Sequence, residues 1–130
     1  MIILASHGHL ASGMKHTAEM IVGIRDDLLA FDAYCDGVDS IKENVTQVIE
    51  ECSEEPIILL TDILGGSVNN ELSQLVRDFP NVKILTGMNL PLILSLLTGD
   101  SRDLESAIDE GKMSIINVNK LLEHFEEDDL

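Results

Sequence analysis

The sequence has few aromatic, cysteine and basic residues, and no long apolar run. Only 3% of the residues are aromatic and none is tryptophan, so aliphatic side chains must fill the core. The two cysteines, Cys35 and Cys52, form no Cys-x-x-Cys pair, which argues against a disulfide framework or a zinc knuckle. No apolar run approaches the roughly 20 residues of a membrane-spanning helix, and the first residues do not resemble a signal peptide. These absences predict a cytoplasmic protein.

Basic residues are outnumbered by acidic ones. Lysine and arginine total 8 and aspartate and glutamate total 24, which gives a net charge of −16 over 130 residues. Acidic residues gather at 50–55 and in a tail at 126–130. Nucleic acids and anionic lipids are polyanions, so this charge argues against both as partners. It favours a well-solvated surface, or steering toward a basic protein partner.

Short apolar runs alternate with amphipathic helical stripes along the chain. This alternation is typical of βαβ units, and it predicts one α/β domain over 1–130 with an open, mainly parallel sheet and helices on both faces. The strands are expected at 2–6, 28–34, 57–62, 82–86 and 113–118. The helices are expected at 10–22, where Gly23 ends the stripe, at 40–52 with a Ser-x-x-Glu capping box at 40–43, and at 67–78, 90–98, 101–110 and 121–125.

Polar residues follow the predicted strands, at the edge where parallel strands end together and ligands bind. His7 follows the first strand, Asp62 follows the third, and Gly65 and Gly66 lead to Ser67 at the expected N-cap of a helix. Neutral imidazole is a nucleophile, and a carboxylate bonded to one ring nitrogen fixes its tautomer. Backbone N–H groups of Gly65, Gly66 and Ser67, with the serine hydroxyl, suit an anion. The set predicts a phosphoryl-transfer site that needs no metal and no cofactor.

The same residues leave other interpretations open. His7 also fits an ordinary surface histidine, Asp62 a turn residue, and the glycine-serine run a common turn and cap. The loop has neither the Gly-Lys-Ser/Thr of a Walker A motif nor a Gly-x-Gly-x-x-Gly fingerprint. His9, with His7 and Asp62, would suit a metal-binding or small-molecule-binding α/β domain, although no second Cys/His cluster supplies further ligands.

Three segments occur in a specific combination: Ser-His-Gly at 6–8, Thr-Asp-Ile-Leu-Gly-Gly-Ser at 61–67, and Thr-Gly-Met-Asn-Leu-Pro at 86–91. Together they resemble the mannose-family enzyme IIA component of the bacterial phosphoenolpyruvate:sugar phosphotransferase system, over nearly the whole chain. The resemblance implies that His7 accepts a phosphoryl group from HPr and passes it to a separate IIB component, with Asp62 orienting the ring and Ser67 supplying a hydroxyl. It also implies a homodimer that exchanges the strand at 113–118, and a membrane permease as an indirect partner.

The chain departs from that family at 68–70, where Val-Asn-Asn replaces the usual Pro-Phe-Asn. Loss of the proline is expected to loosen the first helical turn slightly, and loss of the aromatic residue to change the packing beneath the loop. Two related functions remain as alternatives. One is the phosphoryl donor subunit of a dihydroxyacetone kinase, which resembles the same family, and the other is a non-catalytic regulatory module of the same fold.

Overall fold

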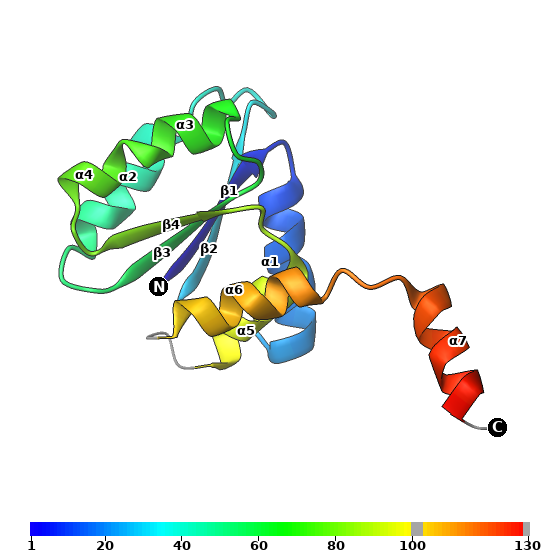
Figure 1. The fold of residues 1–130 in the computed structure, drawn as a ribbon. Helices are drawn as coiled ribbons and strands as arrows, with labels where there is room; N and C mark the ends of the chain where they lie inside the picture. The colour runs from blue at the N-terminus through cyan, green and yellow to red at the C-terminus, as the bar shows by residue number, and fades with distance from the viewer. Residues whose placement is uncertain (100–102, 129–130) are drawn as a thin grey trace. The chain divides into compact units, whose positions relative to one another are not determined.

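The computed structural model describes residues 1–99 and 103–128, which fall into two compact units, Met1–Leu90 and a second unit from Pro91 onward. The first unit contains a sheet and the helices that connect its strands (Figure 1). Its elements in chain order are β1 (Ile2–His7), α1 (Leu10–Val22), β2 (Leu28–Ala33), α2 (Lys42–Glu51), β3 (Ile57–Thr61), α3 (Ser67–Ser73), α4 (Leu75–Asp78) and β4 (Val82–Thr86).

The four strands of the sheet are all parallel and lie in the order β2-β1-β3-β4. The predicted open parallel sheet is therefore confirmed. From β1 the chain first adds β2 on one side and then crosses to add β3 on the other side. The carboxyl ends of β1 and β3 thus form the topological switch point, where an open α/β sheet leaves a crevice for ligands.

Helices cover both faces of this sheet, with α1 on one face and α2, α3 and α4 on the other (Figure 1). Residues along β1 and β3 are buried without the polar alternation of a half-exposed strand, as expected for strands covered on both sides. On the face of α2, α3 and α4, the buried core consists of Ile3, Ala5, Ala33, Ile41, Val45, Ile49, Ile57, Leu59, Val68, Leu72, Leu75 and Val82.

On the other face, side chains from two strands hold the start of α1. Ser6 and Asp32 are partners in the β1–β2 register, so both point to the same face of the sheet. Ser6 Oγ accepts the N–H of Ala11 at 2.7 Å, and Asp32 Oδ1 accepts the N–H of Ser12 at 3.0 Å. The first N–H groups of a helix lack helical acceptors, so these strand residues cap α1, whose N-cap residue His9 makes no side-chain cap.

The second unit contains α5 (Leu90–Thr98) from Pro91 onward, α6 (Leu104–Met113) and α7 (Val118–Asp128). Helix α6 begins where Asp103 accepts the N–H of Ser106 at 3.1 Å, and the predicted start at 101–102 lies outside the described residues. The predicted acidic tail at 126–130 falls partly beyond them too, because α7 ends at Asp128. No helix in the described ranges is long and apolar enough to cross a membrane.

The predicted strand at 113–118 is wrong. Met113 ends α6, because the Ser114 N–H donates to the carbonyl of Glu110 at 3.1 Å and closes the last helical turn. Asn117 directly precedes α7, and its side-chain oxygen accepts the N–H of Lys120 at 3.3 Å. An asparagine cap of this kind satisfies free helical donors, and the apolar run at 113–118 concealed the signal.

Two predicted helix starts are also corrected. Helix α2 begins at Lys42 with Ile41 at its N-cap, so Ser40 does not form the predicted capping box. Helix α3 has Gly66 at its N-cap, and Ser67 is its first residue. The Ser40 hydroxyl donates to Glu71 at 2.6 Å and accepts the N–H of Lys42 at 3.3 Å, and the Ser67 hydroxyl bonds to the His7 ring at 3.0 Å.

Candidate functional site

His7 is the last residue of β1, and Asp62 follows directly after β3, so the two meet at the switch point of the sheet. One carboxylate oxygen of Asp62, Oδ2, lies 2.9 Å from the backbone N of His7 and 2.7 Å from its ring Nδ1. An ionised carboxylate only accepts hydrogen bonds, so Nδ1 carries the ring hydrogen. In neutral imidazole the other nitrogen, Nε2, then has a free lone pair.

Ser67 contacts that second nitrogen. Its Oγ lies 3.0 Å from His7 Nε2, and the hydroxyl donates because Nδ1 already carries the hydrogen. The imidazole is therefore held at both nitrogens, by a carboxylate from the β3 end and by a hydroxyl from the start of α3. The His7 side chain is nevertheless 43% exposed, so a reacting group can reach it from solvent.

The glycine pair makes room for the imidazole. A Cβ at Gly66 would lie 3.1 Å from His7 Cε1 and 2.9 Å from Ile63 Cγ2, which is closer than such atoms pack. Gly65 has φ +81, a conformation that favours glycine. The Gly66 N–H donates to the carbonyl of Ile63 at 3.2 Å and so closes the loop. This N–H is one of the three backbone groups that were predicted to bind an anion.

The departure at 68–70 fits the fold through different contacts. Val68 is buried in the core beneath the sheet. Asn69 is also buried, and its side-chain oxygen accepts the hydroxyl of Thr61 at 2.7 Å. Asn70 donates from its side chain to the carbonyl of Gly65 at 3.2 Å. Asn70 is shared with the family pattern, so the departure itself is confined to Val68, which fills the core, and Asn69, whose side chain bonds to the end of β3.

Sequence reasoning missed Tyr34, which follows β2. Its ring stacks on the His7 ring with centroids 5.7 Å apart and an interplanar angle of 29°. Its hydroxyl donates to Glu71 Oε1 at 2.7 Å, and Ser40 donates to the other oxygen of Glu71 at 2.6 Å. Tyr34 has φ +58, which is unusual for a bulky residue. Only its position directly after a strand could have drawn attention to it.

Hydrogen bonds set the charge of the acidic groups around the imidazole. Burial raises the pKa of Asp62, but hydrogen bonds from His7 and Ile63 outweigh it and hold the pKa below its usual value. Bonds from Ser40 and Tyr34 lower the pKa of Glu71, and the bond to Glu71 raises the pKa of Tyr34. At neutral pH both carboxyl groups are therefore ionised, and Asp62 can stabilise positive charge on the His7 ring.

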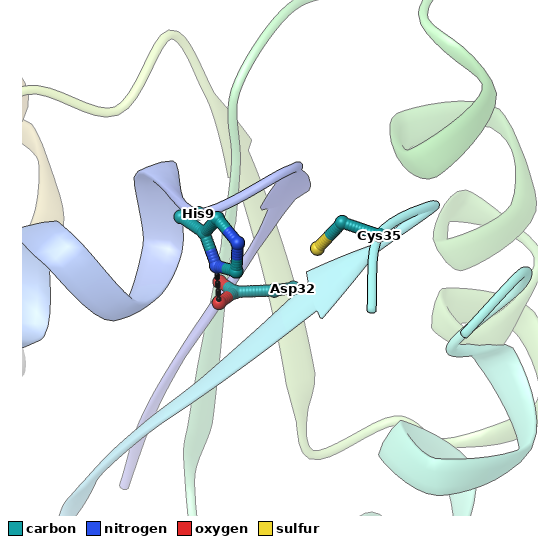
Figure 2. A group of neighbouring side chains, drawn as sticks. All are labelled: His9, Asp32 and Cys35. Carbon is teal, nitrogen blue, oxygen red and sulfur yellow. Dashed lines mark hydrogen bonds and ion pairs between the residues drawn. The ribbon is translucent and has the colours of Figure 1, made fainter. Parts of the chain in front are cut away.

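The alternative of a metal site built from His7, His9 and Asp62 does not match the arrangement of the described residues. The one group there with the proximity of metal ligands is His9, Asp32 and Cys35 (Figure 2). His9 Nδ1 lies 3.1 Å from Asp32 Oδ2, away from the partners of His7. His7 and His9 therefore belong to separate clusters.

Comparison with known protein families gives an independent result. A family model described as "PTS system fructose IIA component" matches residues 1–112. The fructose-specific EIIA component of Bacillus subtilis (strain 168) is 26% identical over 99 residues, which cover 75% of this chain and 68% of that protein. The sorbose-specific EIIA component of Lacticaseibacillus casei is 28% identical over 96 residues, covering 73% and 70%.

The mannose-specific EIIAB component of Escherichia coli (strain K12) is 27% identical over 112 residues, covering 84% of this chain but 34% of that longer protein. Among solved structures, the PTS IIA protein associated with the fucose utilization operon of Streptococcus pneumoniae has a TM-score of 0.80 at 32% identity, covering 93% and 94% of the two chains. A mannose/sorbose-specific IIA subunit from Enterococcus faecalis shares the fold, with a TM-score of 0.76 at 21% identity over 89% of this chain and 92% of that one. The chain thus belongs to the mannose-type enzyme IIA family of the phosphotransferase system, whose members take part in phosphoryl transfer for sugar uptake.

Proposed function

We propose that this chain carries a phosphoryl group on Nε2 of His7, receiving it from HPr and passing it to a separate IIB component in the cytoplasm. The observation that carries the proposal is the placement of the imidazole between two partners. Asp62 Oδ2 lies 2.7 Å from Nδ1, and Ser67 Oγ lies 3.0 Å from Nε2. The first contact selects the nucleophilic nitrogen, and the second lies where a phosphoryl group would be.

The transfer step balances with these groups alone. The Nε2 lone pair attacks the phosphorus of the donor's phosphohistidine, a new P–N bond forms, and the donor's P–N bond breaks. Nδ1 keeps its hydrogen, so the phosphorylated ring gains positive charge that the Asp62 carboxylate stabilises. Transfer to the IIB component is the same step in reverse, with this chain as donor. Neither direction needs a metal or a cofactor from this chain.

Ser67 changes its acceptor during this step. In the free chain its hydroxyl donates to Nε2. Once Nε2 is bonded to phosphorus, the hydroxyl is free to donate to a phosphoryl oxygen. Such an interaction strengthens as negative charge develops on the transferring group, and it lowers the barrier rather than merely binding the donor. Gly65 and Gly66 leave the space beside the ring open for that group.

The surface around His7 suits a protein partner. Next to Asp62, the side chains of Ile63 and Leu64 are 61% and 77% exposed, and Tyr34 is also exposed. Exposed apolar residues beside a reactive group favour protein docking, and the net charge of −16 favours a partner with basic residues around its own histidine.

We also propose that the chain pairs with a second copy, through α7 and the segment before it instead of through an exchanged strand. This part of the second unit exposes Met113, Ile115, Ile116, Val118, Leu121, Leu122 and Phe125. A helix with so much exposed apolar surface is typical of an interface. Light scattering after gel filtration tests this: Leu122→Glu with Phe125→Glu is expected to halve the mass. An unchanged mass would remove α7 from any interface.

Phosphorylation in a reconstituted system tests the carrier function. The chain is incubated with phosphoenolpyruvate, enzyme I and HPr, and its intact mass is read in parallel for wild type, His7→Ala and His9→Ala. We expect one acid-labile phosphate on wild type and on His9→Ala, and none on His7→Ala. His9 is the matched control because it lies two residues from His7 and its ring contacts Asp32 and Asp36 instead of Asp62 and Ser67.

The outcomes distinguish a wrong site assignment from a wrong function. Labelling of His7→Ala but not of His9→Ala would make the site assignment wrong. No labelling of a folded wild-type chain would reject the carrier function and favour the regulatory module. Addition of purified IIB components to the phosphorylated chain then identifies the acceptor, because only the cognate component removes the phosphate rapidly.

A further inference from the structure

A second polar cluster lies at the carboxyl edge of the sheet, on the face that α1 covers. His9 comes from the turn between β1 and α1, Asp32 from β2, and Cys35 from the loop that follows β2. One ligand atom from each of the three lies within 4.8 Å of the others. Figure 2 shows the Cys35 sulfur directed toward the His9 ring and the Asp32 carboxylate.

We propose that His9, Asp32 and Cys35 bind a Zn²⁺ ion. An imidazole, a carboxylate and a thiolate form a mixed N/O/S donor set. Such a set suits zinc better than Mg²⁺ or Ca²⁺, because those two ions prefer oxygen ligands. Three protein ligands leave the fourth tetrahedral position for water. The assignment does not depend on phosphoryl transfer, because His9, Asp32 and Cys35 make none of the hydrogen bonds that hold the His7 ring.

The spacing of the donor atoms is close to what zinc requires. With bonds of about 2.0–2.3 Å, ligand atoms around a tetrahedral zinc ion lie about 3.3–3.8 Å apart. His9 Nδ1 and Asp32 Oδ2 are already 3.1 Å apart. The Cys35 sulfur lies within 4.8 Å of both atoms, so only a small movement separates it from a position on the ion.

Neighbouring groups orient the Asp32 carboxylate and the His9 imidazole. The Ser12 N–H donates to Asp32 Oδ1 at 3.0 Å and the Ser12 hydroxyl donates to Oδ2 at 2.6 Å, so Ser12 holds the carboxylate with Oδ2 beside His9. On the far side of the imidazole, His9 Nε2 lies 3.2 Å from Asp36 Oδ2. With Nδ1 on the metal, the Nε2–H donates to Asp36, which gives the carboxylate–histidine–metal arrangement that fixes the tautomer in known zinc sites.

The charge balance also favours a cation. Asp32 and Asp36 face the two nitrogens of His9. On binding, the Cys35 S–H bond breaks, the sulfur bonds to zinc, and the proton leaves to solvent. The His9 side chain is 64% exposed, so ion and water can reach the site.

Co²⁺ titration of the reduced chain tests the site, because a thiolate bound to Co²⁺ gives a charge-transfer absorption in the near ultraviolet. Zn²⁺ affinity is measured in parallel by calorimetry in a buffer without chelators. We expect one equivalent of either ion per chain, and Zn²⁺ should displace Co²⁺ and remove the absorption. Cys35→Ser should abolish the absorption, and His9→Gln should weaken Zn²⁺ binding at least 10-fold. Asp36→Asn should weaken it about 10-fold, as for other outer-shell carboxylates.

Matched controls distinguish this cluster from general attraction to an acidic chain. Cys52 is a second free cysteine of similar intermediate exposure, and His16 lies on α1. Cys52→Ser and His16→Ala should keep the stoichiometry, the absorption and the affinity. The proposal is overturned if Cys35→Ser keeps the absorption, if His9→Gln binds Zn²⁺ as tightly as wild type, or if wild type binds no stoichiometric ion. Circular dichroism confirms that each variant is folded.

Discussion

Replacing Asp62 with asparagine tests whether charge, or only hydrogen bonding, orients His7. Asp62 Oδ2 accepts both the backbone N–H and the Nδ1–H of His7, and Oδ1 accepts the N–H of Ile63 at 3.0 Å. An asparagine has one oxygen and one NH₂ group, so it cannot accept on both sides. If its oxygen faces His7, the NH₂ group faces the N–H of Ile63. If its NH₂ group faces His7, two bonds are lost and the ring hydrogen is driven to Nε2.

The first orientation is expected because it loses only one bond. A hydrogen bond to a charged group contributes about 1.5–3 kcal/mol and a neutral one about 0.5–1.5 kcal/mol. The phosphorylated, positively charged ring therefore loses about 1–1.5 kcal/mol of stabilisation in the asparagine variant. Since each 1.36 kcal/mol corresponds to a factor of ten in rate, phosphorylation should slow about 10-fold. A population in the second orientation, with the wrong tautomer, slows phosphorylation further.

The assay is the rate of phosphate gain from phosphorylated HPr, followed by quenched intact-mass measurements. Asp36→Asn is the matched control, because it removes one negative charge at the same edge of the sheet from a residue that contacts His9 instead. A rate for Asp62→Asn within twofold of wild type would refute the electrostatic role. Equal slowing by Asp36→Asn would assign the effect to overall charge and partner attraction.

Acid unfolding of the same variant gives a prediction with a defined sign. The folded pKa of Asp62 lies below its usual value, so the carboxylate contributes stability above the unfolded pKa of about 3.9. This contribution is lost as the pH falls through the folded pKa. The stability advantage of wild type over Asp62→Asn, measured by urea unfolding, should therefore be full at pH 7 and shrink below about pH 4. An advantage that stayed undiminished well below pH 4 would contradict the assignment.

Four further substitutions, at three positions, separate the effect of the space around the imidazole from that of its stacking with Tyr34. Gly66 has φ −70 and ψ 160, which alanine adopts freely, but the added Cβ would lie 2.9 Å from Ile63 Cγ2 and 3.1 Å from His7 Cε1. Gly66→Ala should therefore lower the urea midpoint and slow phosphorylation several-fold by displacing the His7 ring. Gly65→Ala should instead keep a near-normal rate, because the space beside it is open, while φ +81 predicts about 1 kcal/mol of lost stability. Tyr34→Gly relieves the positive φ and removes the stacked ring, so we expect slower phosphorylation without lost stability, whereas Tyr34→Phe should retain most of the rate. Equal rates for the two Tyr34 variants would show that the stacking has no role.

Sequence patterns predicted the elements whose signals are local. Three of the strands, β1, β3 and β4, are short, mainly apolar runs ended by a polar residue or glycine, and the prediction for β4 has the bounds observed. The meeting of His7 and Asp62 also followed from topology alone, because parallel strands end at one edge. A strand that is buried on both faces requires apolar side chains at nearly every position, so it is easy to recognise in the sequence as a continuous apolar run.

Contacts between distant segments could not be predicted in the same way. Tyr34 reaches His7 because its backbone adopts φ +58, which no pattern in the sequence signals. Cys35 approaches His9 only because β2 lies beside β1, so cysteine spacing alone gave no ligand set. The segment at 113–118 was mistaken for a strand because an apolar run does not reveal whether a neighbouring strand exists to pair with it.

The alternation of side chains along β1 separates the two clusters at the carboxyl edge. Ser6 shares the face of its register partner Asp32 and fastens α1, whereas His7 points to the opposite face, toward Ser67. Gly8, with φ +57, then turns the chain so that His9 returns to Asp32. A shift of one residue in β1 would exchange the two faces and would remove the histidine from Ser67. The order serine, histidine, glycine is therefore required by the sheet itself: serine caps the helix, histidine enters the carrier site, and glycine permits the turn between them.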